Sequence, residues 1–337
     1  MSKWLVTGGS GFLGSNIIEN LNSNNIDFIN FDLIEPNSYK SNFIKGDIRN
    51  KDELSKAIKG CDKVIHAAAS LPLDKKLFNE INKVGTQNLV ELANEFEIEH
   101  FTYISSSSIF GTKHKEVIGE DTIPTPVEKY GESKYDGELV VNNMLNTHIS
   151  RNFIRSRTIV GKNRLGIFDM LFNFSKNNIP VFLIGKGNNI IQLIDVEEIS
   201  EVIVRLTNKN ISGSFNLGNN DYTTIKKTFE NFIESINSKS KIVHVPIGVS
   251  LISLYLLDKM KLSPFGPWHY KSFHKSCFFE SSKAYEIVDY FPSKSNDDIL
   301  SESFKYYIDN YKFIYENNST HKKKLDLKIF KIFNIFK

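Results

Sequence analysis

The sequence predicts an α/β fold in which helices cover both faces of a parallel sheet, with a smaller C-terminal lobe. Three observations carry this prediction. A glycine-rich turn, from Gly8 to Gly14, joins a first strand to a first helix. Short apolar strands then alternate with helices through the first 161 residues, which is the pattern of parallel strand–helix–strand units. From about Lys162 the alternation loosens, which indicates a second lobe.

The first strand is predicted at Lys3–Thr7, and the apolar residues after the turn recur at helical spacing over about 12–21. Glycines at positions 8, 11 and 14 allow a left-handed backbone, a close approach to a pyrophosphate and tight packing of helix on strand. Free N–H groups at the helix start would face the phosphates. Such a turn also occurs at ordinary strand-to-helix corners, so a second observation is needed.

The second strand, Asp27–Asp32, supplies that observation, because it ends in an acid. Asp32 stands at the distance from the glycine turn where a carboxylate binds the hydroxyls of an adenosine ribose. A carboxylate would repel a 2′-phosphate, and no Lys or Arg follows before Lys40. The sequence therefore favours NAD over NADP as the cofactor.

The rest of the first half continues the alternation. After a loop around Pro36 and residues 42–49, strands are predicted at 63–69, 101–105 and 153–157, with helices at about 52–60, 80–96 and 130–146. The strand at 63–69 ends in residues small enough for a cofactor to lie against, namely Ala67, Ala68 and Ala69.

The second half mixes strands and helices without regular alternation. Helices are predicted at about 164–178, 196–207, 223–237, 281–289 and 298–315, and strands at 180–184 and 214–218. A lobe of this kind would lie over the strand ends where ligands of open α/β sheets bind. The longest apolar run, Val249–Leu257, is far shorter than the roughly 20 residues of a membrane-spanning helix, and we expect it to be a buried helix.

The composition argues against several classes of protein. The 337 residues carry a formal charge of +3, and the few Arg residues do not cluster with aromatic ones, which disfavours nucleic-acid binding. Cys61 and Cys277 lack metal-ligand spacing and predict neither a zinc site nor a disulfide framework. The first strand begins too early to leave room for a cleavable signal, so we expect a cytoplasmic protein.

Tyr130 and Lys134 stand four residues apart, on one face of a predicted helix. A nearby ammonium lowers the pKa of a phenol from about 10, so that Tyr130 could exchange a proton with a substrate hydroxyl while NAD exchanges hydride. The spacing alone is weak, since about one such pair is expected by chance. Three others occur, at Tyr222/Lys226, Tyr255/Lys259 and Tyr290/Lys294.

Context selects Tyr130. It alone lies in the cofactor-binding half, and it follows a strand that ends in Ser105, Ser106, Ser107 and Ser108. A serine at the end of this strand would lie where the nicotinamide binds and could donate a hydrogen bond to the oxygen being oxidised. An isolated serine run is more often a polar turn, but the downstream Tyr130 favours the catalytic interpretation.

These motifs together resemble the extended short-chain dehydrogenase/reductases, also called the NAD-dependent epimerase/dehydratase family, over roughly residues 3–315. The resemblance implies a Rossmann-type doubly wound sheet and a homodimer. It implies that Tyr130 is the catalytic acid/base, that Lys134 lowers its pKa and holds the nicotinamide ribose, and that Ser106 is the catalytic hydroxyl. The implied cofactor contacts are Gly8, Gly11, Phe12, Leu13 and Gly14 at the pyrophosphate, Asp32 at the ribose, Asp47 and Ile48 at the adenine, and Ala67, Ala68, Ala69 and Asn82 along the cofactor.

The resemblance also implies the domain organisation. Residues 1–161, joined by 195–218, would form the NAD-binding domain. Residues 162–194 and 219–318 would form the substrate-binding lobe, and 319–337 a basic amphipathic tail.

Two departures from the family pattern narrow the chemistry. In family members that dehydrate sugars, the two positions after the catalytic hydroxyl resemble Asp-Glu. This chain has Ser107 and Ser108 at these positions, which argues against elimination of water. Sugar-nucleotide enzymes tend to carry an Arg on the diphosphate, and the matching position here is Ile191. Other cations could replace that Arg, and they are Lys162, Arg164 and Lys186.

Three functions remain open at this point. The first is an NAD-dependent epimerase or dehydrogenase acting at a secondary alcohol carbon of a nucleotide sugar. The second, favoured by Ile191 and by resemblance to 3β-hydroxysteroid dehydrogenases around 266–271 and 278–284, is the same hydride transfer on a sterol or lipid alcohol, where His269 and His274 could contact substrate or simply pack. The third is a non-catalytic NAD-binding regulator, against which Ser106, Tyr130 and Lys134 argue.

The tail beyond residue 320 combines lysines with large apolar residues. On a helical wheel one face carries Leu325, Ile329, Ile332, Phe333 and Phe336, beside a face with Lys324, Lys328 and Lys331. This composition suits the surface of an anionic membrane. A helix that packs on the protein body or on another subunit would carry the same pattern, so both interpretations stay open.

Overall fold

The computed structural model describes residues 2–70, 77–111, 117–162, 168–260 and 272–310. The chain forms two compact units. The first comprises Met1–Ile159, Ile194–Gly218 and Phe279–Pro292, and the second comprises Val160–Leu193, Asn219–Phe278 and Ser293–Lys337. Each unit is described by itself below.

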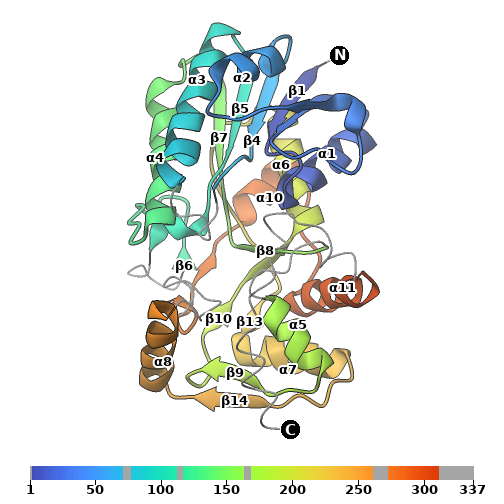
Figure 1. Ribbon diagram of the computed structural model, residues 1–337, viewed down its shortest axis with the longest axis vertical. Coiled ribbons are helices and arrows are strands. Elements are labelled where there is room, and N and C mark those ends of the chain that lie inside the picture. Colours follow the sequence, from blue (N-terminus) through green and yellow to red (C-terminus); the bar gives the residue numbers. More distant parts are fainter. Residues whose placement is uncertain (1, 71–76, 112–116, 163–167, 261–271, 311–337) are drawn as a thin grey trace. The chain divides into compact units, whose positions relative to one another are not determined.

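A seven-stranded sheet forms the centre of the first unit (Figure 1). Its order is β12-β7-β5-β4-β1-β2-β3, and every neighbouring pair is parallel. The bounds are β1 Lys3–Thr7, β2 Asp27–Asp32, β3 Phe43–Lys45, β4 Lys63–His66, β5 His100–Ile104, β7 Ser150–Ser156 and β12 Gly213–Leu217. The predicted fully parallel sheet is confirmed.

The first strand, β1, lies between β2 and β4, so the chain builds outward from it in both directions. At its last residue, Thr7 is in register with Phe31 on one side and with His66 on the other. Parallel strands present their carboxyl ends at one edge, and a ligand binds where the strand order reverses. The glycine turn that follows β1 therefore lies at the expected binding edge.

Helices cover both faces of this sheet (Figure 1). One face carries α2 (Lys51–Ile58), α3 (Thr86–Glu95) and α4 (Lys129–Met144), and the other carries α1 (Phe12–Ser23), α6 (Val196–Asn208) and α10 (Ser282–Val288). Each set buries an apolar cluster against the strands, which hold alternate side chains toward the two faces. The predicted helix over 80–96 is two segments, because a π-helical turn at Asn79–Gly85 precedes α3.

The segment Phe279–Pro292 belongs to the first unit, whereas the sequence predicted it in the second lobe. The physical reason is its apolar content. Ala284, Tyr285 and Val288 of α10 are buried in the same cluster as α1 and α6, and the Tyr285 hydroxyl hydrogen-bonds the backbone of Gly218 at the end of β12. A short amphipathic helix gives no sequence signal of which core it joins.

The second unit has a separate core rich in aromatic residues. Phe172, Phe232, Phe304 and Tyr307 pack with ring centroids between 5.5 and 6.1 Å apart. They come from α5 (Phe168–Lys176), α7 (Ile225–Ser235) and α11 (Asn296–Asp309). Two strand pairs complete the unit, β9 (Val181–Ile184) with β14 (Ile242–Val245) and β10 (Ile190–Ile191) with β13 (Thr223–Thr224).

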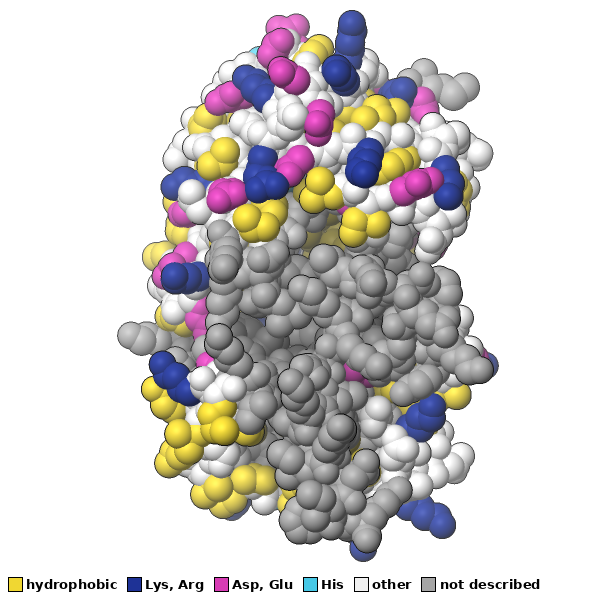
Figure 2. Space-filling model, viewed as in Figure 1, with side chains coloured by type: hydrophobic (Ala, Val, Ile, Leu, Met, Phe, Trp, Pro, Cys, Tyr) yellow, Lys and Arg dark blue, Asp and Glu magenta, His cyan; other side chains and the backbone are white. Residues whose placement is uncertain are grey.

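The apolar run at 249–257 lies in α8 (Ile247–Lys259), and the prediction that this helix is buried is wrong. Ser250 is the only buried residue of α8, whereas Ile252 is 64% exposed and Leu256 54% exposed. Hydrophobic side chains gather in Figure 2 where Figure 1 places α8. Among the described residues, no helix has both the length and the apolar character to cross a membrane.

Candidate active site

The glycine turn packs against the end of β4. Gly8 has a φ of +71°, in the left-handed region, and a Cβ atom there would lie 2.5 Å from the Ala68 nitrogen. Gly14 lies directly on the Gly8 carbonyl, where a Cβ atom would overlap it. Only glycine fits both positions, because the turn and α1 must approach each other and β4 so closely.

The N-terminus of α1 lies at this turn. Gly11 precedes the helix, and no side chain caps it. Backbone N–H groups of the first helical turn have no partner within the helix itself, and together with the helix dipole they favour an anion. This arrangement fits the pyrophosphate of a dinucleotide.

Asp32 ends β2 beside the same turn. Its carboxylate accepts hydrogen bonds from the backbone N–H groups of Ser10 and Ile34, both at 3.0 Å. Burial raises the pKa of Asp32, and these backbone donors oppose that rise. Since the donors fix the carboxylate at the binding edge, Asp32 fits a group that accepts hydrogen bonds from ribose hydroxyls.

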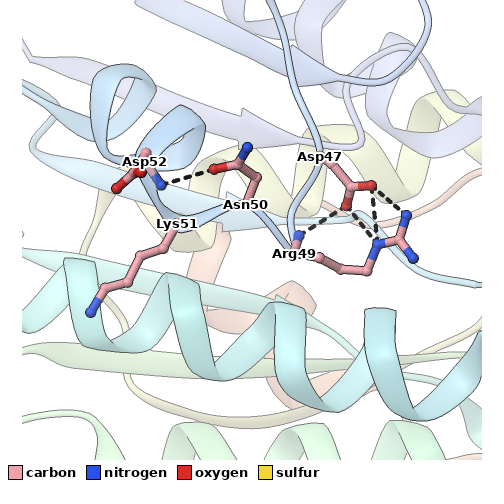
Figure 3. Close-up of a pocket in the computed structure, with 5 residues that line it drawn as sticks. All are labelled: Asp47, Arg49, Asn50, Lys51 and Asp52. Carbon is pink, nitrogen blue, oxygen red and sulfur yellow. Dashed lines mark hydrogen bonds and ion pairs between the residues drawn. The ribbon is translucent and has the colours of Figure 1, made fainter.

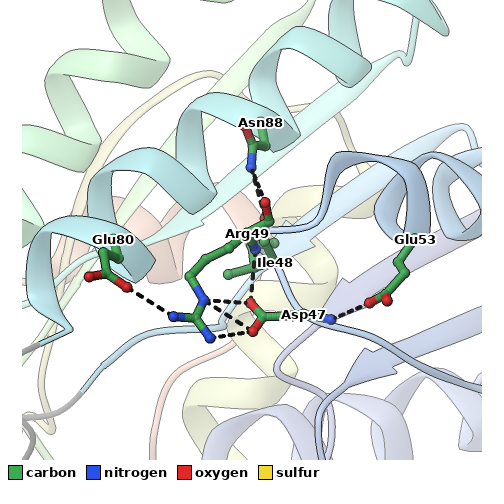
Figure 4. Close-up of polar contacts among 6 residues, drawn as sticks. All are labelled: Asp47, Ile48, Arg49, Glu53, Glu80 and Asn88. Carbon is green, nitrogen blue, oxygen red and sulfur yellow. Dashed lines mark hydrogen bonds and ion pairs between the residues drawn. The ribbon is translucent and has the colours of Figure 1, made fainter.

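A second acidic position, Asp47, is held by Arg49 (Figure 3). The Arg49 Nη2 lies 2.6 Å from one Asp47 oxygen, and its Nε donates to both oxygens at 3.0 Å. The opposite side of the guanidinium donates to Glu80 at 2.9 Å (Figure 4). The hydrogen bonds from Arg49 lower the pKa of Asp47. Neither Arg49 nor Glu80 was predicted from the sequence. The position of Arg49 two residues after Asp47 is the one local signal for the first pairing, and no local signal indicates Glu80.

Ile48 lies between these ionic residues and is fixed by its backbone. Asn88 donates to the carbonyl oxygens of Ile48 at 3.2 Å and Arg49 at 3.1 Å (Figure 4). Gly85 packs on the Ile48 side chain, where a Cβ atom would lie 2.6 Å away. The loop that carries Asp47 and Ile48 is therefore rigidly attached to the helical segment 79–95.

Beneath the binding edge runs a chain of buried polar contacts. Thr7 Oγ1 lies 2.7 Å from His66 Nδ1, and His66 Nε2 lies 3.0 Å from Thr86 Oγ1. Burial lowers the pKa of His66 to about 3, so the imidazole is neutral. Asn82 accepts from the Ser70 N–H at 2.7 Å and donates to Ser133 Oγ at 2.9 Å. Thr86 Oγ1 donates to the Asn82 carbonyl at 2.8 Å, and the whole chain of contacts therefore joins β1 and β4 to Ser133 of α4.

The helix α4 presents Tyr130 and Lys134 one turn apart. Tyr130 is partly buried, with its ring centroid 5.9 Å from that of Phe78. Lys134 is 3% exposed, and burial lowers its pKa to about 7. Two glycines allow α4 to approach the sheet, because a Cβ atom at Gly131 would overlap the Ser108 carbonyl and one at Gly137 the Tyr103 hydroxyl.

The serine run forms the start of a short 3₁₀ helix, Ser107–Phe110, after β5. Ser106 Oγ caps it by accepting from the Ser108 N–H at 3.2 Å, and the Ser108 hydroxyl donates to it at 3.0 Å. Because Gly131 packs on Ser108, the run adjoins the first turn of α4. The first unit thus brings the Ser106 segment, Tyr130 and Lys134 to the edge that holds the glycine turn.

Other predicted residues lie elsewhere. Ile191 is in β10 of the second unit, which also contains Lys162, Lys186 and His274. Arg164, His269 and the tail 319–337 fall outside the described residues. Burial raises the pKa of the Cys61 thiol to about 12, and the described part of the chain has no cluster of three metal-ligating side chains.

Comparison with known proteins gives several related sequences. The family model for the NAD dependent epimerase/dehydratase family matches residues 4–218. An uncharacterized protein of Sinorhizobium fredii, y4nG, is 30% identical over 90% of this chain and 78% of its own length. A putative UDP-glucose 4-epimerase of Methanocaldococcus jannaschii is 26% identical over 71% of this chain and 84% of its own length. Human sterol-4-alpha-carboxylate 3-dehydrogenase is 28% identical over 58% of this chain and 54% of its own length.

Solved structures share the fold. The UDP-glucuronic acid 4-epimerase of Bacillus cereus, crystallised with NAD, superposes with a TM-score of 0.70 over 92% of this chain and 99% of its own, at 24% identity. The family uses NAD, and the turn, the uncapped α1 and Asp32 fit that cofactor. The chain belongs to the NAD-dependent epimerase/dehydratase family, the extended short-chain dehydrogenase/reductases.

Proposed function

We propose that this enzyme transfers hydride reversibly at a secondary alcohol carbon of a nucleotide sugar, as a 4-epimerase or a simple dehydrogenase. One observation carries the proposal. The helix α4 holds a partly buried phenol, Tyr130, one turn from an ammonium, Lys134, that is almost fully buried. A 26% identical relative described as a putative UDP-glucose 4-epimerase supports the nucleotide-sugar assignment.

The proposed chemistry divides among three side chains. Tyr130 takes the proton from the substrate hydroxyl and returns it in the reverse direction. The charge on Lys134 favours the phenolate form of Tyr130, and the ammonium also holds the nicotinamide ribose. The Ser106 hydroxyl donates to the substrate oxygen. NAD, when bound, supplies the hydride acceptor.

The proposed cofactor contacts follow the binding edge. The turn residues Gly8, Gly11, Phe12, Leu13 and Gly14 would hold the pyrophosphate through backbone N–H groups, and Asp32 the adenosine ribose. Asp47 and Ile48 would contact the adenine, and Ala67, Ala68, Ala69 and Asn82 would line the cofactor. The Asp32 carboxylate favours NAD over NADP, because it would repel a 2′-phosphate.

Elimination of water does not fit the residues after Ser106. A dehydratase needs an acid and a base at these positions, and Ser107 and Ser108 are neutral hydroxyls at ordinary pH. The Ser108 hydroxyl instead donates to Ser106. This leaves the Ser106 proton for the substrate oxygen, which suits hydride transfer alone.

A second candidate substrate is a sterol or other lipid alcohol. Ile191 takes the place of the Arg that would bind a diphosphate, and the human sterol dehydrogenase is a relative over part of the chain. The hydride chemistry and its three side chains would be unchanged. The two candidates differ only in what the second unit must recognise.

A screen with UDP-sugars and with 3β-hydroxysteroids separates the candidates. An epimerase converts a UDP-sugar into its isomer without net NADH, a dehydrogenase accumulates NADH, and the second candidate reduces NAD only with the steroid. Mass spectrometry of small molecules that co-purify with the protein gives an independent identification. The proposal would be contradicted if the protein converted neither substrate class, or if Tyr130→Phe formed the same products at the same rate as the unchanged protein.

We further propose that the enzyme is a cytoplasmic homodimer whose basic tail, residues 320–337, contacts the inner face of the membrane. Lysines beside large apolar residues support the membrane contact, because each Lys near an anionic surface contributes about 1 kcal/mol of binding free energy.

Deletion of 320–337 should release the protein from vesicles that contain phosphatidylglycerol. Unchanged flotation of the truncated protein would refute the contact, and a monomeric mass in solution would refute the dimer.

A further inference from the structure

We propose that Tyr103 is a positioning residue. The face of its ring holds the Lys134 ammonium in place, one helical turn after Tyr130 on α4, and favours the charged form of Lys134. The inference rests on the proposed function, in which Lys134 acts on Tyr130. It concerns a residue of β5 that has no part in the proposed proton or hydride transfer.

The geometry places the ammonium over the aromatic face. The Lys134 Nζ lies 4.5 Å from the centroid of the Tyr103 ring, inside the roughly 6 Å at which a cation is attracted to the negative face of a ring. Tyr103 is fully buried, so water does not screen this attraction. The ring is held in turn by His66, with centroids 5.6 Å apart, and by Phe153 at 6.4 Å.

The contact depends on a glycine in α4, at position 137. The Tyr103 hydroxyl occupies the space that a side chain at position 137 would fill, so that a Cβ atom at Gly137 would overlap it. The same hydroxyl donates to the Lys134 carbonyl at 3.4 Å, a long and weak bond. The ring and not the hydroxyl is therefore the part of Tyr103 that acts on the ammonium.

The charge on Lys134 needs this support because burial opposes it. Among the described residues, the Glu138 carboxylate favours the charged form of Lys134. The Glu138 oxygens, however, already accept hydrogen bonds from Arg155 at 2.8 and 3.1 Å. The other titratable groups around the site do not replace it, since His66 is neutral and Asp136 pairs with Lys83 at 3.6 Å. Loss of the ring face should thus lower the pKa of Lys134 further and raise the pKa of Tyr130.

The test compares Tyr103→Phe, which keeps the ring, with Tyr103→Leu, which removes it. The titration of Tyr130 is followed by phenolate absorbance in the protein without substrate, as the difference from the same variant that also carries Tyr130→Phe. We expect Tyr103→Leu to raise the Tyr130 midpoint by about half a pH unit or more and Tyr103→Phe to leave it unchanged. Phe215→Leu, a change of the same kind at a fully buried ring of β12, should leave the midpoint unchanged as well.

A second measurement follows the pH profile of kcat/KM, whose acidic limb should move to higher pH in Tyr103→Leu alone. Should Tyr103→Leu fail to fold, stepwise fluorinated phenylalanines at position 103 keep the shape and weaken the ring face progressively. An unchanged midpoint in folded Tyr103→Leu, or across the fluorinated series, would overturn the inference. An equal shift in Tyr103→Phe would do so too. The titration needs no substrate, so a shifted midpoint without turnover of any sugar or steroid would refute the proposed function and leave the Tyr103 contact intact.

Discussion

The same Tyr-x-x-x-Lys spacing occurs on two helices with opposite surroundings. On α4, Lys134 is 3% exposed and lies over the ring of another residue, Tyr103. On α8, Tyr255 is 51% exposed, and Lys259 lies over the ring of Tyr255 itself at 5.6 Å. Only in the first pair does the surrounding protein bury the lysine and so shift its pKa.

The difference shows that spacing puts two side chains on one helix face and does nothing more. Burial shifts the pKa of Lys134, and the glycines of α4 permit that burial by removing side chains that would hold the helix away from the sheet. On α8, the added Cβ atom at Gly248 would meet nothing within 4 Å. Matched substitutions on α4 and α8 therefore test whether the burial of the pair, and not its spacing, determines activity and stability.

The largest effect is expected from the phenols. Tyr130→Phe removes the group that we propose exchanges the proton, and it should lower kcat/KM by about 10²- to 10⁴-fold. Tyr255→Phe makes the same change on an exposed helix and should leave kcat/KM unchanged. Steady-state kinetics with the substrate identified in the screen measure both, and equal losses in the two variants would abolish the distinction between the helices.

The next effect is on stability and concerns the lysines. The pKa of Lys134 is about 7 in the folded protein against an ordinary value of 10.5, so the buried charge destabilises the fold below pH 7. The folded protein loses the proton near pH 7, and the remaining penalty fades between pH 7 and 10.5, because the unfolded chain then also comes to lose its proton. Lys134→Met should therefore raise the free energy of unfolding by about 3 kcal/mol at pH 6, with a smaller gain at pH 9.

The control for this prediction is Lys259→Met, which should change stability by less than about 0.5 kcal/mol at either pH. Urea titrations at pH 6 and pH 9, without cofactor, measure all three proteins. A destabilised Lys134→Met would show that the packing of the lysine stem outweighs the cost of its charge.

Smaller effects of opposite sign are expected at the glycines. Gly137→Ala forces a methyl group against the Tyr103 hydroxyl and should destabilise the protein by about 1–3 kcal/mol. Gly248→Ala improves the helix propensity of α8 in open space and should stabilise it by about 0.5–1 kcal/mol. Thermal unfolding decides both, and two changes of the same sign would contradict the comparison.

The smallest effect is expected on the surface of α8. Leu256 is 54% exposed, so Leu256→Ser should cost less than about 0.5 kcal/mol in unfolding free energy. The corresponding change in a buried helix, Leu206→Ser on α6, should cost at least about 2 kcal/mol. A cost at Leu256 that grows with protein concentration would mean that α8 is covered in an assembly.

The glycine turn and the strands and helices beside it were the most predictable part of the fold, because their signals are local. The turn at Gly8, the acid at Asp32 and the Tyr130/Lys134 pair each follow from a few neighbouring residues. The parallel sheet followed from the strand–helix alternation. These features depend on backbone conformation and helical periodicity, which a short segment determines by itself.

What the sequence did not predict depends on contacts between distant segments. The pairing of Arg49 with Glu80 joins residues 31 positions apart, and the assignment of α10 to the first unit depends on packing against α6. The exposure of α8 was missed because a continuous apolar run is ordinarily buried, and periodicity cannot say what lies outside the helix. Ring contacts such as Tyr103 with Lys134 leave no pattern in the sequence.

The buried polar chain from Thr7 through His66 and Thr86 has a practical consequence for protein engineering. Because its hydrogen bonds, with those of Asn82, tie Thr7 at the end of the first strand to α4, a glycine turn grafted from a relative together with position 7 would disturb α4 unless the partners of Thr7 were transplanted with it. The smallest exchangeable module in a chimera is therefore the turn together with residues 66, 82 and 86.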